Sequence, residues 1–169
     1  MWLRDQLPKD LPFVRSIIYG YETKLVGSQS FQSINDLALG FIGDLRTIRK
    51  SVNNAIVFFA HSLGGIVLKR AIINIANSGT GEDEILHRIR MTCFFGVPSH
   101  GMHIEHLLAM VKEQPNQGLV ESLSTESRYL PEVDIQFSGL AVFRAIRFIS
   151  VYETRRSLTT KVMSKYPPI

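Results

Sequence analysis

Ser62 is the residue whose neighbours best fit a chemical role. It follows the apolar run of residues 55–60 and precedes a second apolar segment, with Ala60 two positions before it and Gly64 two positions after it. A nucleophilic serine on a sharp strand-to-helix turn needs small residues at those two positions, because the backbones approach each other closely there. Gly65 would let the following helix start close to the strand. The pattern predicts a nucleophile elbow at Ser62, although the same short motif without its flanking segments also fits an ordinary turn.

The predicted turn also contains groups that would stabilise a negative charge. The N–H of Leu63, the residue after the serine, is one expected oxyanion donor, and the N-terminus of the following helix adds a positive dipole end. His61 is adjacent to Ser62, but neighbouring side chains diverge on such a turn, so His61 is not expected to act as the base. Its expected role is packing or hydrogen bonding beside the strand.

Strand-like and helix-like segments alternate along the chain and would place this turn at the edge of a sheet. Apolar residues recur every three or four positions between 30 and 50, with Ser30 as the expected N-cap. The apolar runs at 55–60 and 91–98 are typical of strands covered on both faces. The expected elements are a short N-terminal helix at 1–12, strands at 14–21, 55–60, 91–98 and 143–153, helices at 30–50, 65–77 and 104–114, and short helices between 115 and 139. This alternation predicts an α/β protein with a mostly parallel sheet and helices on both faces.

Composition and charge limit the classes of function. The chain has 169 residues, 45% of them hydrophobic, which is enough for one compact core, and its net charge of +4 comes from scattered basic residues. Nucleic-acid binding needs basic side chains clustered on one face, so that function is not expected. The single cysteine, Cys93, lies in an apolar run and is expected in the core. No apolar run is long enough for a transmembrane segment, and the N-terminus lacks the apolar region of a signal peptide.

Three histidines, His100, His103 and His106, lie close together in the sequence. One helical turn could present His103 and His106 side by side, but zinc would want a third or fourth ligand. A solvated loop and helix start is therefore expected, with no metal and no cofactor. His87 has no evident partner.

Three motifs resemble, in their order and spacing, those of the serine active-site-containing protein family of α/β-hydrolases. They are Trp-Leu-Arg-Asp-Gln-Leu-Pro with a later Tyr-Gly-Tyr (residues 2–21), Ala-His-Ser-Leu-Gly-Gly (60–65) and Phe-Phe-Gly-Val-Pro-Ser (94–99). The chain is also similar to the lipase-like modules fused in fungal proteins to NACHT-type nucleotide-binding and ankyrin-type repeat domains. The likeness covers residues 2 to about 154. It implies a partial α/β-hydrolase fold and a serine esterase or lipase that acts on a lipid-like ester.

The sequence departs from this family's pattern at two places. Ala60 stands where the family has the first glycine of the elbow, which is sterically tolerable. Residues 97–99 read Val-Pro-Ser in place of the family's Thr-Pro-His, and a histidine follows only at His100. The second change gives the loop that follows the strand at 91–98 a different sequence from the loop of the family.

The acid and the base of an α/β-hydrolase follow the nucleophile along the chain, in that order. The strand expected at 143–153 ends at Glu153, which both this order and the resemblance nominate as the acid. All five histidines precede Glu153, so none is expected to be the base. The loop that carries the second oxyanion donor in the family would lie before Trp2. The chain is therefore expected to be a single, incomplete hydrolase domain over residues 1–169, nearly inactive by itself, with a tail at about 155–169 that could be disordered.

The alternative interpretation is a non-catalytic interaction or signalling module, or the truncated product of a gene for a larger multidomain protein. An incomplete sheet would have exposed edges, so self-association is expected in either case. No targeting signal is recognised in the sequence, and an intracellular location is expected. The resemblance implies association with the endoplasmic reticulum or the mitochondrion.

Overall fold

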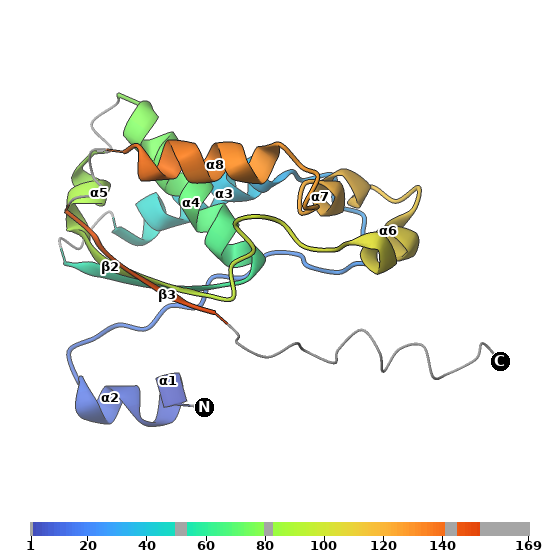
Figure 1. The fold of residues 1–169 in the computed structure, drawn as a ribbon. Helices are drawn as coiled ribbons and strands as arrows, with labels where there is room; N and C mark the ends of the chain where they lie inside the picture. The colour runs from blue at the N-terminus through green and yellow to red at the C-terminus, as the bar shows by residue number, and fades with distance from the viewer. Residues whose placement is uncertain (1, 50–53, 80–82, 141–144, 153–169) are drawn as a thin grey trace.

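The computed structural model describes residues 2–49, 54–79, 83–140 and 145–152 of the chain (Figure 1). Within these ranges, helices and strands alternate through most of the chain, as the apolar patterns predict. In order, the elements are α1 (Trp2–Asp5), α2 (Leu7–Asp10), α3 (Ile34–Arg49), β1 (Ile56–His61), α4 (Leu63–Asn77), α5 (Asp83–Arg88), β2 (Ile89–Phe95), α6 (Glu105–Val111), α7 (Gln117–Glu121), α8 (Tyr129–Ser138) and β3 (Arg147–Val151).

The three strands form one parallel sheet in the order β1-β2-β3. His61, at the end of β1, lies opposite Phe95, and Phe95 lies opposite Val151 at the end of β3. The carboxyl ends of all three strands therefore meet at one edge of the sheet. This arrangement confirms the predicted α/β fold with a parallel sheet.

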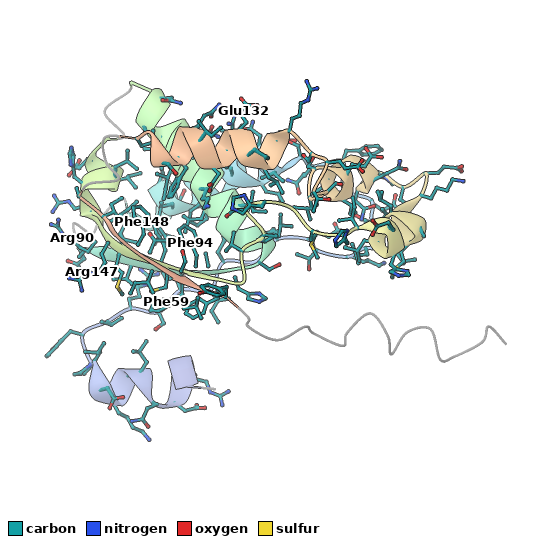
Figure 2. The ribbon with its side chains drawn as sticks, viewed as in Figure 1. Phe59, Arg90, Phe94, Glu132, Arg147 and Phe148 are labelled. Carbon is teal, nitrogen blue, oxygen red and sulfur yellow. The ribbon has the colours of Figure 1, made fainter. Side chains whose placement is uncertain are left out.

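The hydrophobic core lies between the sheet and the helices α3, α4 and α8, which cover the same face (Figure 1). The central helix is α4, which is buried on most sides because α3, α8 and β1 all pack against it. On the inner face of the sheet, the rings of Phe94 and Phe148 stack with their centroids 6.3 Å apart, and Phe137 of α8 packs edge-on against both (Figure 2).

The opposite face of the sheet is largely uncovered in the described structure. We call it the open sheet face; its exposed apolar side chains are Val57, Phe59, Phe95, Ile149 and Val151. Along β1 the burial alternates, so the prediction that this strand is covered on both faces is wrong for the described residues. Figure 1 shows α1 and α2 on this side of the sheet but set apart from it. An apolar run predicts burial, but it does not specify which segment covers the strand.

The strand predicted at residues 14–21 is absent. This segment has no regular secondary structure and pairs with none of the described strands. Val14, Ile17 and Ile18 are exposed, whereas Tyr19 packs edge-on against Phe41 of α3 at 4.8 Å between ring centroids. The β-branched and aromatic composition fits a pleated surface, but composition does not provide the neighbouring strand with which a strand must pair.

Helix α3 begins later than the sequence pattern predicts. Ser33 caps it instead of Ser30: the Ser33 hydroxyl accepts a hydrogen bond from Asp36 N at 3.2 Å, and Ser33 N donates to the Asp36 carboxylate at 2.9 Å. This reciprocal pair is a capping box. Phe31 lies within the range predicted for this helix, but it precedes the cap and is 83% exposed.

Candidate functional site

Ser62 occupies the turn between the end of β1 and the start of α4, with φ 50° and ψ −128°. Within the described ranges, only Ser62 and Glu113 among the non-glycine residues have a positive φ. Both backbone groups of Ser62 are hydrogen-bonded: Ser62 N donates to Phe95 O at 3.0 Å, and Ser62 O accepts from Gly65 N at 3.0 Å. Ser62 is half-buried, and its side chain makes no capping hydrogen bond to α4. The hydroxyl is therefore not engaged in holding the helix.

The small residues around Ser62 have unequal steric roles. Ala60 is buried at the end of β1. A Cβ added to Gly65 would lie 2.1 Å from Cγ2 of Val97, so this position has no space for a side chain. A Cβ on Gly64 would meet only the Tyr21 hydroxyl, at 3.6 Å, which is an ordinary contact distance. The close approach that requires glycine is thus between Gly65 and the loop after β2.

The N-terminus of α4 supplies backbone N–H groups beside this turn. Leu63 is the first residue of the helix, so its N–H belongs to the first turn, where backbone donors have no partner within the helix. The helix has 15 residues, and its positive end lies at Ser62. Together these groups form an environment suited to a negatively charged oxygen.

The carboxyl end of β2 lies beside this turn, and the carboxyl end of β3 lies one strand further along the sheet. Gly96, directly after β2, donates its N–H to Val151 O at 2.8 Å, and Tyr152 follows β3 with its side chain exposed. Glu153, the predicted acid, lies outside the described residues. So does the predicted tail at 155–169.

The five histidines are all exposed. His61 ends β1 on the open sheet face, and the Nδ1 of His103 lies 3.7 Å from a carboxylate oxygen of Glu105 at the surface. The described residues hold no group of three or more histidine, cysteine, aspartate or glutamate side chains that could bind a metal ion. Cys93 is a buried free thiol, as predicted.

Two residues near the turn were not singled out from the sequence. Tyr21, within the motif at residues 2–21, places its hydroxyl beside Gly64, and burial raises the pKa of this phenol. Lys69 is a buried cation in α4 that pairs with Asp134 of α8 at 2.6 Å. The sequence signal for Lys69 was present, since a lysine stands among the apolar positions of a helix that is buried on most sides.

No protein-family model and no curated protein sequence matches this chain. Its fold resembles that of a solved structure, the lipase BlEst2 of Bacillus licheniformis in mature form, with a TM-score of 0.52 and 16% sequence identity. The match covers 70% of this chain and 47% of that chain, so this chain spans less than half the length of the lipase. At this identity the likeness shows the fold, which is lipase-like and partial. None of the helices in the described part of the chain is long and apolar enough to cross a bilayer.

Proposed function

We propose that this chain carries the nucleophile of a serine hydrolase, and that Ser62 forms an acyl-serine with an ester substrate. The observation that carries the proposal is the strained backbone of Ser62, φ 50° and ψ −128°, between a parallel strand and a helix. Non-glycine residues held in such conformations cluster at active sites. The lipase-like fold supports the same class of chemistry.

In the proposed reaction the Oγ of Ser62 attacks the ester carbonyl, and the N–H of Leu63 binds the resulting oxyanion. The tetrahedral intermediate then collapses, the C–O bond to the alcohol breaks, and the alcohol leaves with the proton from the serine. Water subsequently hydrolyses the acyl-serine. By analogy with the family that the motifs resemble, the substrate is a lipid-like ester and Glu153 orients a histidine base.

All five histidines precede residue 153, so this sequence does not supply that base in the expected order. Losing a triad member reduces the rate of serine hydrolases by several orders of magnitude. We therefore expect Ser62 to react slowly, and we expect an external base to accelerate the reaction.

Covalent labelling with a fluorophosphonate probe tests the proposal. The purified chain is compared with Ser62→Ala and with Ser78→Ala, a control at the other end of α4 whose hydroxyl bonds to Ile75 O. We expect weak labelling that rises with added imidazole in the wild type and in Ser78→Ala, and that is absent in Ser62→Ala. Equal labelling of the wild type and Ser62→Ala would contradict the proposal and favour the non-catalytic interaction module.

A further inference from the structure

Lys69 is a buried cation on α4, two helical turns after Ser62 and on the same side of the helix. Its Nζ donates to Asp134 Oδ1 of α8 at 2.6 Å and to Ser99 Oγ at 2.8 Å. It also lies 5.5 Å from the ring centroids of Phe94 and Phe137. Figure 2 shows Phe94 between the sheet and the helices. The network lies at the margin of this core, since the Lys69 side chain is 11% exposed and that of Asp134 is 34% exposed.

Core stability alone does not explain a lysine at this position. Burying the Lys69 ammonium costs free energy, and a salt bridge to a carboxylate that is 34% exposed repays little of this cost. A methionine could fill much of the same space. It could not donate a hydrogen bond to Ser99, which belongs to the loop after β2. The distinctive contribution of Lys69 is therefore this connection between α4 and the loop.

The loop that Lys69 holds is short and internally bonded. Ser99 N donates to Val97 O at 2.9 Å, and Gly101 N donates to Pro98 O at 3.0 Å. Val97 packs directly against Gly65 in the first turn of α4. The middle residue of the loop, Ser99, thus contacts Lys69, and its first residue, Val97, contacts Gly65 beside the Ser62 turn.

The loop and the Ser62 turn are also connected through the end of β2. Phe95 O accepts the hydrogen bond from Ser62 N, and two residues later the chain reaches Val97. A loop that shifts away from α4 would move the Val97 side chain from Gly65 and pull on Phe95. These two contacts join the loop to the turn that contains Ser62.

We propose that Lys69 is a positioning residue for the nucleophile turn. Through Ser99 it holds residues 97–101 against α4, and the loop in turn fixes the backbone of Ser62, while Asp134 neutralises the buried charge. The catalytic meaning of this inference rests on the proposed function of Ser62. The structural claim, that Lys69 and the loop hold the backbone of the Ser62 turn, does not rest on that function. It can therefore be measured without any reaction.

Hydrogen exchange at the Ser62 and Gly65 amides directly measures how often the two backbone hydrogen bonds of the turn open. The variants are Lys69→Met and Ser99→Ala, with Ser99→Thr as the conservative variant that keeps a hydroxyl. Arg70→Met is the matched control, because the neighbouring Arg70 is also partly buried and donates to Asn35 and Gln136 without contacting the loop.

We expect exchange at these two amides to accelerate at least tenfold in Lys69→Met and in Ser99→Ala, while the last turn of α4 keeps its wild-type rates. Ser99→Thr and Arg70→Met should leave the two amides unchanged. Ser99→Ala keeps the Lys69–Asp134 pair, so it provides the test if Lys69→Met does not fold. Wild-type exchange at both amides in Ser99→Ala would overturn the inference.

The fluorophosphonate rate separates this inference from the proposed function. We expect labelling of Ser62 to slow at least tenfold in Ser99→Ala and to keep its wild-type rate in Arg70→Met. If exchange accelerates but the wild type labels no better than Ser62→Ala, the function proposed for Ser62 fails and the positioning of the turn stands. If exchange accelerates and the labelling rate of Ser62 is unchanged, the turn does not limit the reaction and the positioning role is refuted.

Discussion

Gly65→Ala is the substitution that tests the packing of the turn at Ser62 most directly. The added Cβ would lie 2.1 Å from Cγ2 of Val97, 2.9 Å from Cγ1 and 3.1 Å from Cβ. Carbon atoms normally approach to about 3.5–4.0 Å, so either the loop or α4 must move by more than 1 Å. Overpacking of this kind costs about 1–3 kcal/mol. Because three atoms of one rigid side chain are involved, we expect an overpacking cost in the upper part of that range, about 2–3 kcal/mol. The higher helix propensity of alanine offsets up to about 1 kcal/mol, so urea unfolding should show a net loss of about 1–2 kcal/mol.

Gly64→Ala is the matched control, since its Cβ would lie 3.6 Å from the Tyr21 hydroxyl and meets nothing closer. Alanine is favoured over glycine in a helix by up to about 1 kcal/mol, so this variant should be neutral or slightly stabilising. Val97→Ala removes the two nearest methyl groups, and in the double variant it should recover at least about 1 kcal/mol of the Gly65→Ala loss. Equal stability of Gly65→Ala and Gly64→Ala, or strict additivity of Gly65→Ala with Val97→Ala, would refute the packing described for this turn.

Two further variants test the open sheet face and the helix cap. Phe59 is 57% exposed on the open sheet face. If uncovered parts of the sheet cause self-association, Phe59→Lys should reduce the association detected by concentration-dependent sedimentation. Ile135→Lys, at a 73% exposed position on α8, should not reduce it. A wild type that stays monomeric at every concentration would contradict this prediction. Hydrogen bonds from Ser33 lower the pKa of Asp36 from 3.8. The contribution of Asp36 to stability is therefore fully present above that value and lost as the pH falls through the lower folded-state pKa. Ser33→Ala should lower the free energy of unfolding by about 1 kcal/mol at pH 7 and by less in acid, as measured by urea unfolding at both pH values. An equal loss at the two pH values would contradict this role of the Ser33–Asp36 bonds.

The parts of the fold that follow from local pattern were predictable from the sequence. The helical periodicity of residues 65–77 and the apolar runs around it gave the order β1, α4 and β2, because these signals are carried by consecutive residues. The strand expected at 14–21 failed for the opposite reason. Its composition favours a strand, but a strand also needs a neighbouring strand to pair with, and the presence of that neighbour depends on the tertiary structure. The start of α3 was misplaced by a few residues, because Ser30 and Ser33 have the same capping chemistry and only the bonds with Asp36 distinguish them.

The contacts that support the candidate site could not be predicted, because they join residues that are distant in the sequence. Lys69 meets Asp134 across 65 positions and Ser99 across 30. Gly65 could be identified as a small residue near the serine, but the Val97 side chain that makes glycine necessary belongs to another loop. Each of these pairings depends on how α4 lies against the sheet and α8, and that arrangement is set by the whole core.

The backbone geometry of Ser62 supports the proposed function more strongly than the motif around it does. A positive φ at a non-glycine residue costs about 1–3 kcal/mol and persists only where the surroundings determine it. Glycine would relieve this cost, and a serine at a helix N-terminus normally stabilises the helix by bonding its hydroxyl to a backbone N–H. Ser62 keeps the strained φ and makes no such bond. Stability therefore explains neither the residue type nor its conformation. Since alanine would be about as strained at this φ as serine, a difference in labelling between Ser62→Ala and the wild type would reflect the hydroxyl and not a change in the turn.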